Sequence, residues 1–138
     1  MKFYKKANTG IIIKFKYKKL IIPVFKGSTR IAIPLFKRIV IKIPNILNYR
    51  MFLYGILGNL QERKWYKITK HKKLCPVYFS LAGLINIMPY CYELSDKEFK
   101  SLDYNKFIQY GNSLFPVENK KCSFKKLNDK IIIVDYGN

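Results

Sequence analysis

Acidic residues are almost absent from the first 80 positions of this 138-residue sequence, which hold 19 Lys/Arg and one acid, Glu62. Residues 81–138 hold 8 basic and 7 acidic side chains, so nearly all of the net charge of +19 belongs to the N-terminal part. Such an asymmetry attracts phosphates and other polyanions through salt-sensitive electrostatics. We therefore expect weak, non-specific polyanion binding. The abundance of Lys, Ile, Asn and Tyr is also typical of AT-rich coding, in which many lysines are ordinary solvated residues.

Cysteine and histidine are scarce. The three cysteines, Cys75, Cys91 and Cys122, are far apart in the sequence, and His71 is the only imidazole. This pattern excludes the usual ligand sets of a structural zinc site. Residues 1–10 show neither the apolar stretch nor the cleavage site of a secretory signal, so we expect reduced thiols and a cytoplasmic location.

Long hydrophobic runs are nearly absent as well. Residues 75–92 form an uncharged stretch of 18 residues, which is close to the length that spans a bilayer. Pro76 and Pro89 lie inside it, and Gly83 and Asn86 interrupt it, a pattern that favours two buried strands joined by a turn. We expect no stable membrane insertion.

The length allows a single domain, and no linker-like segment divides it. Strands are predicted from β-branched and aromatic runs at 11–17 (an edge strand), 20–25, 30–36, 38–43, 77–80, 84–88, 123–127 and 131–134. Helical periodicity predicts a helix over 52–70, with a start after Gly58 as the alternative, because Gly55 and Gly58 each cost about 1 kcal/mol in a helix interior. A Ser95–Glu98 capping box predicts a second helix. The expected fold is α+β, with an antiparallel sheet of about five strands, Lys42 on the third, and the helix carrying Glu62 packed against it.

Three charged residues stand in the order found in protein kinases. Arg38-Ile39-Val40-Ile41-Lys42 resembles the kinase Val-Ala-Ile-Lys strand, whose lysine neutralises the α and β phosphates of ATP. Glu62 follows twenty residues later on the predicted helix, where it can hold this lysine in place. Asp135-Tyr136-Gly137 follows an apolar strand and resembles the metal-binding Asp-Phe-Gly motif.

The wider resemblance is to the small kinase-like proteins of tailed bacteriophages, over about residues 20–138. It is carried by Lys42-Ile43-Pro44, Asn59-Leu60-Gln61-Glu62, Leu74-Cys75-Pro76-Val77, Met88-Pro89 and Asp135-Tyr136-Gly137. It implies a minimal protein kinase-like fold with an N-lobe over about 20–90 and a reduced C-lobe over about 91–138, preceded by a basic segment, 1–19. It also implies ATP and Mg²⁺ as ligands, a host or phage protein as partner, and the host cytoplasm as location.

The resemblance also implies roles for individual residues. Those implied for catalysis are Lys42, Glu62, Glu118 and Asp135. Those implied for nucleotide binding are Gly27, Lys42, Met88 (at the hinge) and Asp135, and those for magnesium are Asp135 and Ser123. As a metal ligand, Asp135 is expected to matter for ATP binding only when magnesium is present.

Two departures from the kinase pattern favour weak or lost phosphotransfer. Glu118 and Ser123 stand where the catalytic loop has Asp and Asn, and residues 27–30 are not a glycine-rich phosphate loop. The remaining alternatives are a phosphotransferase, a pseudokinase-like binder, and a basic nucleic-acid-binding protein that uses Lys14, Lys16, Lys18 and Lys19 with Phe15 and Tyr17. Residues 81–85 match half of the LAGLIDADG endonuclease motif, but no metal-binding acid follows them.

Overall fold

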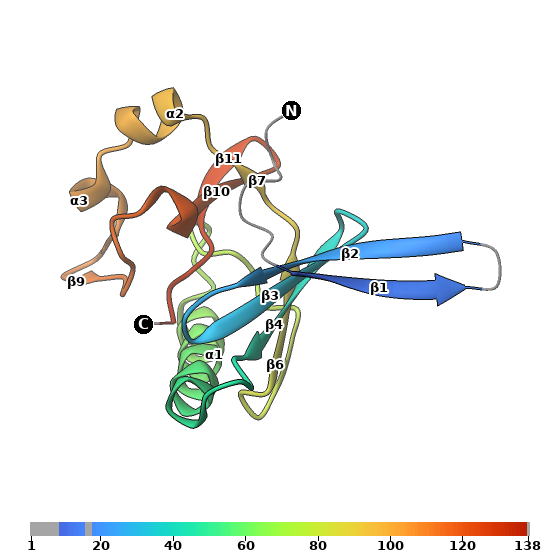
Figure 1. Cartoon of the computed structure of the whole chain (residues 1–138). Coiled ribbons are helices and arrows are strands. Elements are labelled where there is room, and N and C mark those ends of the chain that lie inside the picture. The colour runs from blue at the N-terminus through green and yellow to red at the C-terminus, as the bar shows by residue number, and fades with distance from the viewer. Residues whose placement is uncertain (1–8, 16–17, 138) are drawn as a thin grey trace.

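The computed structural model describes residues 9–15 and 18–137, and the side chains of residues 24, 25 and 27–137. Within these residues the chain forms a six-stranded sheet, one long helix beside it, and a C-terminal part of short helices and hairpins (Figure 1). All strand pairs of the sheet are antiparallel. The expected α+β class with an antiparallel sheet is therefore confirmed.

The large sheet has the strand order β1-β2-β3-β4-β6-β5. Its members are β1 (Thr9–Phe15), β2 (Lys18–Lys26), β3 (Arg30–Leu35), β4 (Ile39–Pro44), β5 (Phe79–Leu81) and β6 (Ile85–Pro89). The predicted edge strand is present as β1, with residues 16 and 17 outside the described part. The sheet therefore has six strands rather than about five, and Lys42 lies on the fourth strand in chain order.

The uncharged stretch 75–92 contains the β5–β6 hairpin, as its prolines and Gly83 predict. Ala82 and Gly83 form its turn, and both have positive φ values. Among the described residues, no helix combines the length and the apolar character needed to cross a membrane.

Strands β1 and β2 form an arm that projects from the body of the molecule (Figure 1). The two strands pair along the whole of β1, whereas β2 pairs with β3 only through Phe25 and Lys26. Lys14 lies opposite Lys19 in this register, near the far end of the arm. The arm therefore carries lysine positions away from the rest of the sheet.

Helix α1 (Tyr49–Thr69) confirms the helix predicted over 52–70, and because it begins before both glycines, the alternative of a start after Gly58 is wrong. The Asn48 side chain caps it by accepting a hydrogen bond from Met51 N at 3.2 Å. The glycines are present because α1 lies very close to the sheet: a Cβ on Gly55 would overlap Thr29 O and lie 2.8 Å from Pro44 Cα. Close packing here outweighs the lower helix propensity of glycine.

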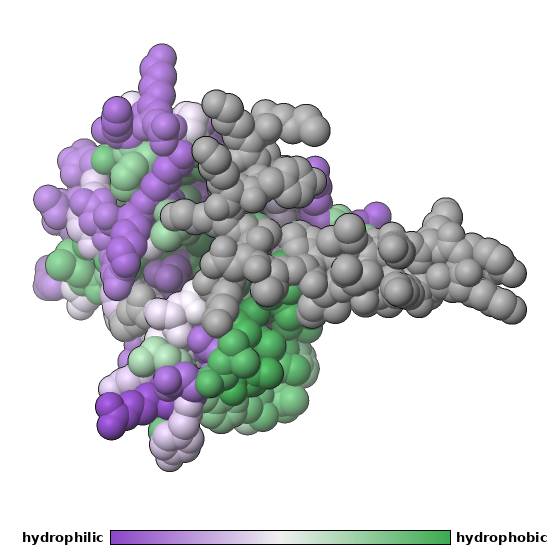
Figure 2. All heavy atoms as spheres, viewed as in Figure 1, coloured by the Kyte–Doolittle hydropathy of each residue, from purple (hydrophilic) through white to green (hydrophobic). Residues whose placement is uncertain are grey.

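The buried side of α1 is formed by small and polar residues, Gly55, Gly58, Asn59 and Glu62. Leu53, Leu57 and Leu60 are exposed instead. Other apolar residues gather below the arm, over β4 and β6 (Figure 2). The contact between helix and sheet is therefore polar at its centre, and the main apolar core lies elsewhere.

That core belongs to the C-terminal part and is centred on Leu74, Phe115, Phe124, Ile133 and Tyr136. The elements there are β7 (Tyr92–Glu93), α2 (Asp96–Ser101), α3 (Tyr104–Phe107), β8 (Gln109–Tyr110), β9 (Ser113–Leu114), η1 (Lys121–Ser123), β10 (Phe124–Leu127) and β11 (Lys130–Ile133). The predicted capping box is present at α2. Hairpin β10–β11 pairs with β7 and delivers residues 134–137 to the side of α1.

Candidate functional site

Lys42 and Glu62 lie in contact between the sheet and the helix. Lys42 extends from β4, and its Nζ is 2.8 Å from Glu62 Oε1 on α1. The Glu62 side chain is completely buried, and that of Lys42 is mostly buried. An ion pair in such surroundings is screened much less by salt than one at the surface.

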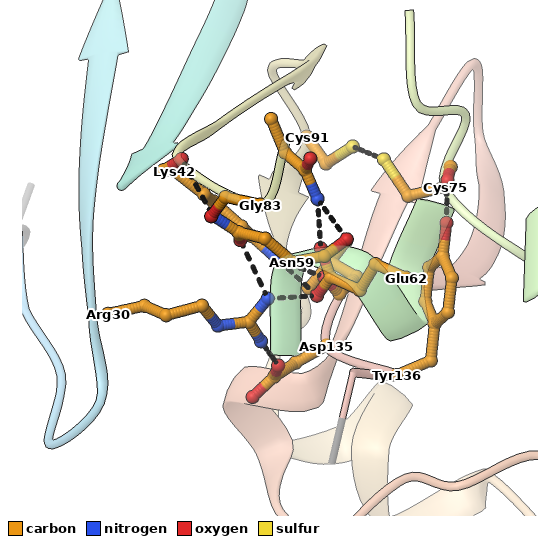
Figure 3. Close-up of polar contacts among 11 residues, drawn as sticks. Arg30, Lys42, Asn59, Glu62, Cys75, Gly83, Cys91, Asp135 and Tyr136 are labelled. Carbon is orange, nitrogen blue, oxygen red and sulfur yellow. Dashed lines mark hydrogen bonds and ion pairs between the residues drawn. The ribbon is translucent and has the colours of Figure 1, made fainter. Parts of the chain in front are cut away.

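Asp135 reaches the same place from the C-terminal part. Lys42 Nζ donates a hydrogen bond to Val134 O at 2.5 Å, so the end of β11 is fixed against β4. The next residue, Asp135, forms an ion pair with Arg30. Arg30 Nη1 in turn lies 2.7 Å from Glu62 Oε1. The three residues singled out from the sequence therefore converge, with Arg30 between the two carboxylates (Figure 3).

Arg30, at the start of β3, is the residue that the sequence interpretation missed. Burial by itself would lower the pKa of the guanidinium, but the carboxylates of Glu62 and Asp135 raise this pKa above its ordinary value. The chain contains 4 arginines against 23 lysines. An arginine directly after a turn, in a chain that otherwise prefers lysine, was the available signal, because a guanidinium can serve two carboxylates at once.

Two buried asparagines complete the surroundings of Glu62. Asn59 Nδ2 donates to Gly83 O at 2.9 Å, and its Oδ1 accepts a long hydrogen bond from Arg30 at 3.4 Å. Asn86 Nδ2 donates to Asn59 O at 2.9 Å and lies 3.5 Å from Glu62 Oε2. These amides join α1 to the β5–β6 hairpin and restrict the position of the Glu62 carboxylate. Asn86 could have been identified from the sequence, because it is a polar residue inside an otherwise apolar strand.

Tyr136 and Gly137 anchor the segment that carries Asp135. The Tyr136 hydroxyl donates to Cys75 O at 2.7 Å, and burial, together with the nearby Glu62 carboxylate, raises the pKa of this phenol. Gly137 lies against α1 so closely that an added Cβ would be 2.9 Å from Glu62 Cγ.

The fold also brings two cysteines together that are not close in the sequence: the sulfur atoms of Cys75 and Cys91 lie 3.7 Å apart.

The other four residues with implied roles lie in four different parts of the fold. Gly27 is in the β2–β3 turn, where its N donates to Arg30 O at 2.8 Å. Met88 is buried in the apolar core. Ser123 is also buried, and its carbonyl accepts from Val134 N at 2.9 Å. The Glu118 side chain is 51% exposed and pairs with Lys120. The structure thus places Ser123 beside the strand that leads to Asp135, and Glu118 on the surface.

Arg30, Lys42, Glu62 and Asp135 are called the charge cluster below. Its formal charges balance, with two cations against two carboxylates. Among the side chains that the structure describes, no group of three or more His, Cys, Asp or Glu is placed to hold a metal ion. No protein-family model, curated protein or solved structure matches this chain. Functional inference therefore depends on the cluster itself.

Proposed function

We propose that the charge cluster is the phosphate-binding site of a kinase-like fold that binds ATP with little or no phosphotransfer. The observation that carries the proposal is the position of Lys42, 2.8 Å from Glu62 Oε1 and hydrogen-bonded to the residue before Asp135. A strand lysine held by a helix glutamate beside an aspartate is the arrangement with which kinases bind the ATP phosphates. The order of Lys42, Glu62 and Asp135 along the chain is also the order of the corresponding residues in protein kinases.

The electrostatics of the chain also support an anionic ligand. Glu62, the only acid among residues 1–92, is buried and already paired with two cations. The N-terminal part that supplies Arg30, Lys42 and Glu62 therefore carries a large excess of basic side chains, and such an excess raises the local concentration of anions. Hydrogen bonds from Lys or Arg to phosphate are about twice as strong as neutral ones.

Phosphotransfer itself has weaker support. A general base must come within about 2.6–3.2 Å of the proton that it abstracts. Glu118, which stands in the position of the kinase catalytic aspartate, is exposed and paired with Lys120. The buried Ser123 is a poorer magnesium ligand than asparagine. We therefore infer a nucleotide-binding role of the pseudokinase kind, with slow or absent turnover.

Lys42→Met tests the proposal directly. The substitution removes the cation but keeps an unbranched apolar stem, and Glu62 retains its ion pair with Arg30. We expect ATP affinity, measured by isothermal titration calorimetry, to fall by about tenfold or more, which corresponds to about 1.4 kcal/mol of binding free energy. Lys64→Met, on the exposed side of α1, is the matched control and should bind as wild type does. ATP binding that is undetectable in the wild type, or equal in the Lys42 variant, would contradict the proposal.

A second candidate function is binding of nucleic acid or another polyanion by the β1–β2 arm. The specific observation is that this arm projects from the body and carries Lys14 opposite Lys19 near its far end. A two-stranded ribbon fits a nucleic-acid groove, and lysines bind phosphates without regard to sequence. The side chains that the sequence singles out for this function lie outside the described ones, namely those of Lys14, Phe15, Lys16, Tyr17, Lys18 and Lys19.

Removing two arm lysines, in a Lys14→Gln and Lys19→Gln double variant, should reduce the salt dependence of oligonucleotide binding. For each phosphate that the arm no longer neutralises, the slope of log affinity against log salt should fall in magnitude by about 1. Fluorescence anisotropy with a double-stranded oligonucleotide measures this slope. The control is a double variant at the exposed Lys100 and Lys106, which removes the same charge from the C-terminal part. Equal slopes in the two double variants would exclude the arm as the binding element.

A further inference from the structure

The resemblance assigns a magnesium ion to Asp135 and Ser123, but the side chains of this chain do not fit one. Mg²⁺ requires near-octahedral oxygen ligands, usually one or two carboxylates with waters and phosphate oxygens. The Asp135 carboxylate is engaged by Arg30. The Ser123 side chain is buried, and the neighbouring Glu62 carboxylate already holds both Arg30 and Lys42. Each carboxylate near the proposed phosphate site is thus neutralised by a protein cation.

The charge of the cluster also disfavours a bound magnesium ion. Two carboxylates attract a divalent cation when they are unpaired, but here two cations offset them. The whole chain adds a formal charge of +19, which repels a metal ion and attracts a polyanion. Both the local and the overall electrostatics therefore favour a free phosphate group over a metal–phosphate complex.

Asp135 is the member of the cluster that an incoming anion can most easily displace. Its side chain is 38% exposed, against 9% for Arg30 and none for Glu62. Because its carboxylate is already partly in contact with water, Asp135 regains its hydration more easily than the fully buried Glu62 would when the pair opens. A guanidinium released in this way has a planar pair of N–H donors that matches two phosphate oxygens.

We propose that the site binds its nucleotide phosphates without a divalent metal, with Arg30 and Lys42 as the two cations and Asp135 as the carboxylate that the phosphate displaces. This inference rests on the proposed nucleotide-binding function and changes the role of Asp135. A metal ligand supports ATP binding, whereas a displaced carboxylate competes with it. The two roles therefore predict opposite effects of the same substitution.

The test is calorimetric titration of ATP in excess EDTA and, separately, in excess MgCl₂. Wild-type protein should bind ATP in EDTA at least as tightly as with magnesium. Asp135→Asn should tighten binding in EDTA by about threefold to fivefold, the factor that a partly exposed ion pair supplies. Arg30→Gln should weaken it by about tenfold or more, because one of two phosphate-binding cations is removed. Asp129→Asn and Arg63→Gln, at exposed positions, remove the same charges and should leave ATP binding unchanged.

Several outcomes would overturn the inference. Wild-type binding that requires magnesium, or a weaker affinity of Asp135→Asn with magnesium, would identify Asp135 as a metal ligand while the nucleotide function stands. Unchanged affinity of either Asp135→Asn or Arg30→Gln in EDTA would equally contradict the inference. If ATP does not bind in either buffer, both the proposed nucleotide-binding function and the inference about metal-free binding are contradicted. If Arg30→Gln fails to fold, Arg30→Lys keeps the charge without the planar fork, and weaker binding in EDTA is again the expected result.

Discussion

Replacing Glu62 with alanine should lower the free energy of unfolding by about 3–5 kcal/mol, because removal of one partner leaves buried charges uncompensated. Glu62 is the common partner of Arg30 and Lys42, at 2.7 Å and 2.8 Å. Without it, the partners that remain among the described residues are the Val134 carbonyl for Lys42 and, as a carboxylate, the partly exposed Asp135 for Arg30. Urea denaturation followed by circular dichroism measures the change, provided that the m-value stays constant.

Glu118→Ala is the matched control for this experiment. Glu118 also forms an ion pair, with Lys120, but both side chains are at least half exposed. Exposed pairs of this kind contribute little or nothing measurable. The control variant should therefore unfold at the wild-type urea concentration. A Glu62 variant as stable as Glu118→Ala would show that the buried ion pairs do not hold α1 to the sheet.

Gly55→Ala should destabilise the protein by about 3 kcal/mol, the upper end of the usual cost of overpacking. The new Cβ would overlap Thr29 O and lie 2.8 Å from Pro44 Cα and Cβ. Thr29 contributes a backbone atom that also accepts a hydrogen bond from Asn45 N at 2.8 Å. It cannot move without breaking that bond, so α1 must shift away from β4. A thermal melt or urea titration measures the destabilisation.

Gly58→Ala, three residues further along the same helix, should leave the free energy of unfolding unchanged or raise it slightly. Its Cβ would lie 3.4 Å from Gly137 O and 3.5 Å from the Arg30 side chain, which are ordinary contact distances. Alanine in a helix interior is more favourable than glycine by about 0.5–1 kcal/mol. This variant should therefore be as stable as wild type or slightly more stable. Equal destabilisation by both substitutions would mean that helix–sheet spacing is not the reason for Gly55.

The strands and the position of α1 could be predicted because they depend on local residue patterns. β-Branched runs between turn residues identify β2, β3 and β4, and the Ser95–Glu98 capping box identifies α2. The buried face of α1 could not be predicted. Apolar periodicity located the helix, yet Leu60 and Ile68 are exposed, while Asn59 and Glu62 are buried. In this helix, burial follows hydrogen bonding and close backbone approach rather than hydrophobicity.

The candidate site was only partly accessible from the sequence. Lys42, Glu62 and Asp135 were singled out by their order, and the structure brings them to one place. The sequence marks Arg30 only as an arginine in a lysine-rich chain and does not show its role, because its contact with Asp135 joins residues 105 positions apart. No pattern near Arg30 names its partners. Such a contact is fixed only when the β10–β11 hairpin is in place beside α1.

The same long separation sets the order of events during protein synthesis. At about 5–20 residues per second, the ribosome completes Asp135 about 5–20 s after Arg30, since 105 residues separate them. In the later part of that interval, after residue 89 completes β6, the strands of the sheet and α1 have been made, but the core residues Ile133 and Tyr136 and the carboxylate that pairs with Arg30 have not. Until the β10–β11 hairpin is made, Arg30 therefore lacks its Asp135 partner, and residues 134–137 do not yet lie against α1 beside Glu62.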